Sequence, residues 1–164
     1  MELKDLLPGI IGSFVGVMGW LVVGIYIQRR QFVRQARNAA KAVYFELDVN
    51  RMAVAVARDY GSFTPLNRSS FERLLPELAT LLSAGDMKSV VSAYTAHAGY
   101  EQLSTTDELP AAVRKQALEG IAAAHEGALA TLAVRAFDRN ERHLLESSAA
   151  DARRGAEEIR KVAS

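Results

Sequence analysis

An uncharged apolar segment near the start of the chain constrains everything that follows it. No residue from Leu6 to Ile27 is charged. At about 1.5 Å per helical residue, this length matches the roughly 30 Å hydrocarbon core of a bilayer. A core helix in a water-soluble protein rarely needs so long an apolar run. We therefore expect residues 1–28 to form a short external N-terminus followed by a transmembrane helix.

Basic residues follow this segment and set its expected orientation. Only Lys4 precedes the segment, whereas a cleavable signal would have its basic residues in front. The basic residues behind it are Arg29, Arg30, Arg34, Arg37 and Lys41. By the positive-inside rule, we expect Arg29, Arg30, Arg34 and Arg37 to set the topology and to contact anionic headgroups. The predicted location is the bacterial inner (plasma) membrane, single-pass, with the N-terminus outside and the C-terminal domain cytoplasmic.

Small residues share one face of the apolar segment. At about 100° per residue, their spacing of three, four and three places them on one stripe. They are Gly9, Gly12, Gly16 and Gly19, with Ser13 beside them. Small residues let helix backbones approach closely in lipid. We therefore expect this stripe to pack against another copy of the chain or against another membrane protein.

Composition favours an all-α fold. Alanine is the commonest residue, no segment alternates as a strand would, and cysteine is absent. The net charge is only +1, so the chain has no long-range field that would attract nucleic acid. We expect a cytosolic antiparallel helical bundle of two long and two short helices over residues 29–137. A charged, alanine-rich helical extension, as a weak coiled coil or a frayed tail, is expected over 138–164.

The apolar segment is expected to continue into the cytosol as one long helix with two apolar faces. Neither Gly nor Pro occurs between Gly24 and Gly61, so the helix should end in the sequence YGSFTP. One face carries Val33, Ala36, Ala40, Val43, Leu47, Asn50, Val54 and Ala57; the other carries Phe45, Val49, Met52 and Val56. Two interpretations stay open. The helix associates with another molecule, or the other helices of its own chain wrap it completely.

Turn and capping residues divide the remainder. Ser69 or Ser70 should cap a short helix that Pro76 kinks or restarts. Ser83 to Asp86 should stop that helix and cap the next, which Gly99 should weaken. The last long helix should begin near Thr105 to Pro110.

The sequence shows no catalytic, cofactor-binding or metal-binding motif. His97, His125 and His143 lack metal-ligand spacing, and both glycine-rich nucleotide loops and the Gly-x-Ser-x-Gly elbow are absent. Glu46 and Asn50 lie four apart, so they are neighbours on a helix. They could hold a cation or a partner's basic group. The better-supported interpretation gives Asn50 a packing role and Glu46 an arginine partner.

These features predict an assembly protein rather than an enzyme. We expect a single-span membrane protein whose cytosolic domain mediates homo- or hetero-oligomeric assembly as a scaffold, adaptor or regulatory subunit. The expected partners are membrane lipid and either another copy or another membrane protein, with no nucleic acid and no small-molecule substrate. The alternative is a pore-forming or membrane-effector subunit, against which the lack of ionisable residues in the span counts. A third hypothesis is an enzyme using Glu46 and a histidine such as His97.

Overall fold

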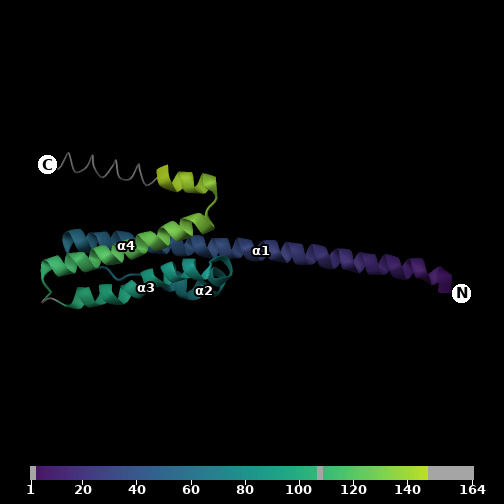
Figure 1. The fold of residues 1–164 in the computed structure, drawn as a ribbon, viewed down its shortest axis with the longest axis horizontal. Coiled ribbons are helices and arrows are strands. Elements are labelled where there is room, and N and C mark those ends of the chain that lie inside the picture. Colours follow the sequence, from purple (N-terminus) through teal and green to yellow (C-terminus); the bar gives the residue numbers. More distant parts are fainter. Residues whose placement is uncertain (1–2, 107–108, 148–164) are drawn as a thin grey trace. The chain divides into compact units, whose positions relative to one another are not determined.

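The computed structural model describes residues 3–106 and 109–147, with side chains from Gly12 onward, and helices form the regular structure of this part of the chain. The helices are α1 (Leu3–Tyr60), α2 (Ser69–Leu81), α3 (Ala84–Thr105) and α4 (Ala111–Ala136), and residues 139–147 are also helical (Figure 1). No strand occurs among these residues. The predicted all-α class is confirmed.

The chain divides into two units, residues 1–35 and 36–164. In the first unit, the described part of α1 exposes large apolar side chains on all sides. They include Phe14, Val15, Met18, Trp20, Leu21, Ile25 and Ile27. By length and composition, α1 is the one described helix that could cross a membrane. A helix that is apolar all round is typical of a membrane span.

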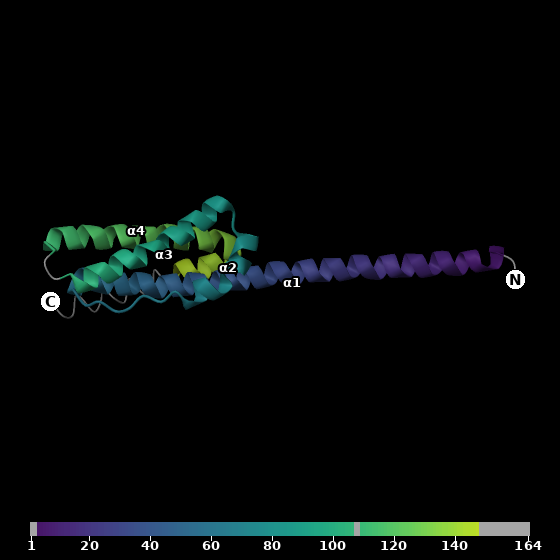
Figure 2. The same ribbon diagram turned by 90° about the horizontal axis from the view of Figure 1, so that it is seen from below.

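The second unit, the helical domain, has an apolar core with two layers. One layer joins residues 40–47 of α1 to residues 128–136 of α4, together with Leu78 of α2 and Val90 and Tyr94 of α3. The other joins Val54 and Ala57 of α1 to Leu118 and Ile121 of α4. The earlier residues of α1 thus share a layer with the later residues of α4, and the later residues of α1 share a layer with the earlier residues of α4. The two helices therefore run in opposite directions. Helices α3 and α4 pack alongside each other (Figure 2).

Only one of the two predicted apolar faces of α1 is buried. Ala36, Ala40, Val43, Leu47, Asn50, Val54 and Ala57 are almost completely buried, although Val33, assigned to the same face, is 46% exposed. The other face is open to solvent, since Phe45, Val49, Met52 and Val56 are between 41% and 58% exposed. The described helices of the chain therefore do not wrap α1 completely.

Two helix ends form as the sequence predicts. Helix α1 ends at Tyr60, and Gly61 follows with φ of +69° while its N–H donates to the Ala57 carbonyl. Glycine adopts this left-handed conformation without the steric cost that a Cβ brings. Helix α3 begins with a reciprocal capping box between Ser83 and Asp86.

The chain stays helical through the two positions at which the sequence predicts a weak point. Helix α2 runs through Pro76, and α3 continues past Gly99 to Thr105. Glycine inside a helix costs about 1 kcal/mol, and burial of Tyr100 and Leu103 beyond it compensates for this cost. Helix α3 is therefore 22 residues long, and α2 is the one short helix among the four. Of the predicted extension over 138–164, residues 148–164 lie outside the described part of the chain.

Two glycine-to-alanine substitutions should have opposite effects on stability. Gly61→Ala should lower the free energy of unfolding by about 1 kcal/mol because alanine is strained at positive φ. Gly120→Ala should raise it by about 0.5–1 kcal/mol because Gly120 lies inside α4 and an added Cβ would meet no atom within 4 Å. Urea unfolding of the full chain in detergent, followed by circular dichroism, measures both. Equal effects of the two substitutions would contradict this account of Gly61.

Candidate functional site

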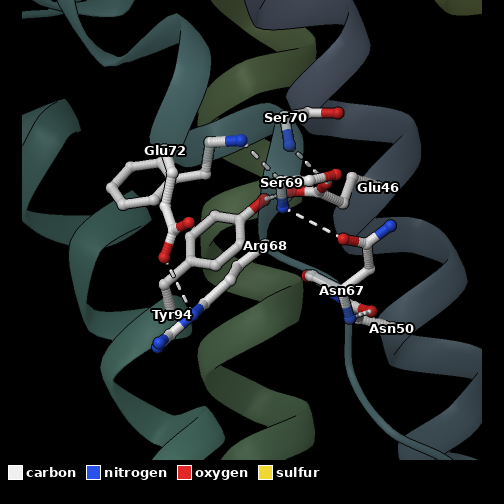
Figure 3. Close-up of polar contacts among 9 residues, drawn as sticks. Glu46, Asn50, Asn67, Arg68, Ser69, Ser70, Glu72 and Tyr94 are labelled. Atoms are coloured by element: carbon white, nitrogen blue, oxygen red, sulfur yellow. Dashed lines mark hydrogen bonds and ion pairs between the residues drawn. The ribbon is translucent and has the colours of Figure 1, made fainter.

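Glu46 and Asn50 form the centre of a buried polar junction between α1 and the start of α2. Both are buried, with 8% and 1% of their surface exposed. They lie one helical turn apart on α1 and point toward residues 67–71 (Figure 3). The sequence identified this pair, but it could not identify their partners because those partners are mainly backbone groups.

The Glu46 carboxylate caps α2 from another helix. The N–H of Ser70 donates to Oε2 at 2.7 Å, and the N–H of Phe71 donates to Oε1 at 3.2 Å. The Tyr94 hydroxyl donates to Oε1 at 2.6 Å, and the Ser69 hydroxyl donates to Oε2 at 3.4 Å. A helix N-terminus stabilises negative charge because its first N–H groups are unpaired within the helix. The partners of the Glu46 carboxylate are therefore backbone and hydroxyl donors, instead of the arginine that the sequence led us to expect.

Asn50 holds the connector that leads into α2. Its Nδ2 donates to the Asn67 carbonyl at 2.6 Å, and its Oδ1 accepts from the Asn67 N–H at 2.9 Å. The Asn67 side chain in turn accepts from the N–H of Ser69 at 3.0 Å. The expected cap at Ser69 or Ser70 is wrong: Arg68 occupies the N-cap position without a capping side-chain bond. The side chains of Asn67 and Glu46 take the place of such a cap, because they accept hydrogen bonds from the first three N–H groups of α2.

Electrostatics at this junction favour an ionised Glu46. Burial alone would raise the pKa of the Glu46 carboxyl, but hydrogen bonds from Tyr94 and from the Ser70 and Phe71 backbone lower it below its usual value. Burial and the adjacent carboxylate raise the pKa of Tyr94, which therefore stays protonated as a donor. Four donors occupy the carboxylate, which offers about four acceptor sites. The observed contacts thus give Glu46 a structural role.

A buried histidine pair joins α3 to α4. His97 and His125 are 1% and 0% exposed, and their Nε2 atoms lie 3.1 Å apart. Nδ1 of His125 lies 2.8 Å from the Ile121 carbonyl, which can only accept, so this nitrogen carries a proton. In a neutral His125, Nε2 then carries no proton, and it accepts a hydrogen bond from the protonated Nε2 of His97. Sequence spacing could not reveal this pair because the two residues lie on different helices.

Burial keeps both imidazoles neutral. It lowers the pKa of His97 to about 4, with a further contribution from His125, and it also lowers the pKa of His125. His97 Nδ1 is buried and has no hydrogen-bond partner among the described residues. These residues also contain no group of three or more metal-ligating side chains. The pair therefore acts as a polar contact inside the core.

The other predicted site residues lie in different surroundings. Arg29, Arg30, Arg34 and Arg37 are exposed, whereas Lys41 forms an ion pair with Glu141 and lies over the Phe137 ring. A Cβ at Gly12, Gly16 or Gly19 would meet no atom within 4 Å, and Ser13 is exposed. Gly9 lies outside the residues whose surroundings are described. No contact between helices of the described chain therefore depends on the small size of Gly12, Gly16 or Gly19.

An open groove between α3 and α4 was not anticipated from the sequence. Its volume is about 1180 Å³, and the residues that line it include Ala96, Gly99, Gly120 and Ala124. Apolar periodicity identified the buried faces of these helices, but it does not indicate where two helices leave a gap.

Comparisons with known proteins give no family assignment: no protein-family model, curated protein or solved structure matches this chain. The geometry of the described residues is therefore the basis for any functional proposal.

Removing the charge of Glu46 should destabilise the helical domain. In Glu46→Gln, the amide NH₂ would face N–H or O–H donors, which should lower the free energy of unfolding by about 2–4 kcal/mol. The matched control Asp48→Asn removes a charge from a partly exposed pair with Arg51 and should cost less than about 1 kcal/mol. Urea unfolding at pH 7.5 compares them. Equal losses would exclude the special role of Glu46.

Acidification should destabilise the protein through the histidine pair. The folded-state pKa of His97 lies below the unfolded value of 6.5, so between these values the unfolded chain binds a proton that the folded chain excludes. Stability should therefore fall from pH 6.5 toward pH 4, by about 2 kcal/mol at pH 5 relative to pH 7.5 from His97 alone. His125 contributes in the same direction. Unfolding midpoints at both pH values test this, and an unchanged slope in His97→Gln would contradict the assignment.

Proposed function

We propose that this protein is a single-span inner-membrane protein whose cytosolic helical domain mediates assembly as a scaffold, adaptor or regulatory subunit. In this proposal, the helices of residues 36–147 act as an antiparallel bundle anchored by the first part of α1. The observation that carries the proposal is the open apolar row on α1, formed by Phe45, Val49, Met52 and Val56 and called the α1 row below.

The α1 row has the properties of a contact surface. Its side chains follow one another at intervals of four, three and four residues, so they lie on one face of the helix. Contiguous exposed apolar surface on a soluble domain commonly marks an interaction site, whereas single exposed apolar residues are ordinary. The opposite face of α1 already lies in the core, and the described helices leave Val49, Met52 and Val56 open, whereas the Phe45 ring also meets the Phe137 ring.

The first unit supports the membrane part of the proposal. Trp20 is 80% exposed and Phe14 65%, and such surface is stable in a hydrocarbon environment but not in water. The exposed arginines at positions 29, 30, 34 and 37 favour a cytoplasmic location for the helical domain. The open small-residue stripe offers a second place for helix contact, within the lipid.

A charge in the α1 row should weaken assembly without unfolding the domain. Val49→Glu places a carboxylate on the row, at a position that is 58% exposed. The matched control, Val134→Glu, alters a valine on α4 that is 61% exposed. We expect Val49→Glu to raise the dissociation constant of the full-length complex at least about tenfold, which is about 1.4 kcal/mol. Val134→Glu should leave it unchanged, and both variants should keep the helical circular dichroism of the original chain.

Light scattering of the detergent-solubilised full chain over a range of concentrations measures this dissociation constant. A monomer at every concentration, with no partner retained after crosslinking in membranes, would refute assembly. Recovery of the chain in the aqueous fraction after gentle lysis would refute the membrane span. Leakage of a dye from cells on induced expression would instead favour a pore-forming subunit.

A further inference from the structure

The α1 row belongs to a longer seam with a heptad register. Counting back from Phe45 by three and then by four residues gives Ala42 and Asn38, so the seam comprises Asn38, Ala42, Phe45, Val49, Met52 and Val56. Ala42 is half-buried, and the other five side chains are exposed. Alternating spacings of four and three are the pattern that two supercoiled helices require at their contact.

We propose that the seam binds the same seam of a second copy of this chain, with the two α1 helices parallel and in register. This inference names the partner in the assembly function and rests on that proposed function. Asn38 is the residue that selects a second copy. A carboxamide both donates and accepts hydrogen bonds, so two identical asparagines can pair across a two-fold axis. The documented case is an asparagine at the a position of a heptad, and Asn38 lies at the d position of the same seam.

The sequence extends this self-complementary pattern toward the N-terminus. In the same register, the preceding seam positions are Gln35, Gln31 and Gln28. Five basic residues lie between positions 29 and 41, and none of them occupies a seam position. Four consecutive amides thus fill the positions at which a second copy would present the same four amides. An identical partner in register would pair each of these amides with the same amide.

Charges beside the seam are compatible with the parallel arrangement. In a parallel pair, each residue directly before Gln35, Ala42 or Val49 would face the residue five further along on the partner helix. Ala39 and Glu46 are buried in their own chain, so Arg34 and Lys41 have no counterpart there. Asp48 and Ala53 are both partly exposed, and their approach brings no like charges together. An antiparallel pair centred on the α1 row would instead bring the two Asp48 residues together. Chains inserted in the membrane with the same topology also present their α1 helices in parallel.

Cysteine crosslinking of the full chain in membranes tests the pairing directly. The chain has no cysteine, so every disulfide would come from an introduced residue. Single variants Asn38→Cys, Val49→Cys and Met52→Cys place cysteines on the seam. Arg37→Cys and Val134→Cys are exposed controls outside it. Under mild oxidation, each seam variant should form disulfide-linked dimers at least about five times more completely than either control, because identical residues face each other only in a parallel, in-register pair.

Two results would overturn the inference. Equal crosslinking of seam and control cysteines would indicate random collision. A disulfide between differently tagged Phe45→Cys and Val56→Cys chains, without disulfides between identical variants, would indicate an antiparallel pair centred on the α1 row. Light scattering of the unmodified chain separates the two proposals. An oligomer without seam crosslinks leaves assembly intact and refutes the seam, whereas a monomer refutes both.

A second pair of variants tests the role of Asn38 without cysteine chemistry. Asn38→Asp would bring two carboxylates together across the axis, so the dimer should weaken at least about fivefold at pH 7.5. The control Asn140→Asp makes the same change at another exposed asparagine and should have no effect. Equal dimer affinity in both variants would exclude Asn38 from the contact.

Discussion

The arrangement of the helical domain depends on the capture of the N-terminus of α2 by the Glu46 carboxylate. Three helices meet at this group, because Glu46 belongs to α1, Ser70 and Phe71 open α2, and Tyr94 belongs to α3. A buried carboxylate is costly unless hydrogen bonds replace its lost hydration. Any packing that separates these partners would leave a buried charge and several N–H donors unpaired. The junction therefore discriminates strongly between the observed arrangement and other compact ones.

Polar contacts continue from this junction through the core to α4. The Tyr94 ring lies 5.0 Å from the His97 ring, and His97 meets His125, which is tied to the Ile121 carbonyl. Apolar packing alone tolerates many combinations of similar volume. The polar contacts have few satisfactory geometries, so they specify which helices are neighbours. This role accounts for the buried carboxylate and imidazole groups of the helical domain.

Helix α1 has a different environment on each of its sides in the helical domain. One side supplies the core and the polar junction, while the other presents the open seam. In the proposed dimer, self-association would use a helix whose position is already fixed by the fold. The two faces of α1 are linked at Phe45, whose ring meets the Phe137 ring of the core edge to face.

The sequence by itself determined the helical class, the length of α1, its end at Gly61 and the capping box at Ser83. Each follows from local chemistry: apolar periodicity, a left-handed glycine, or a side chain reaching a nearby N–H. It also identified Glu46 and Asn50 as neighbours and identified both apolar faces of α1. Local rules mark Gly99 as a weak point but do not tell how far α3 continues beyond it, because the burial of Tyr100 and Leu103 is a tertiary effect. Only the tertiary structure decided that backbone groups of the α2 N-terminus donate to Glu46 and that His97 meets His125, because these contacts join residues 24 to 48 positions apart. It also decided that one face of α1 stays open, because this depends on which faces the other described helices cover.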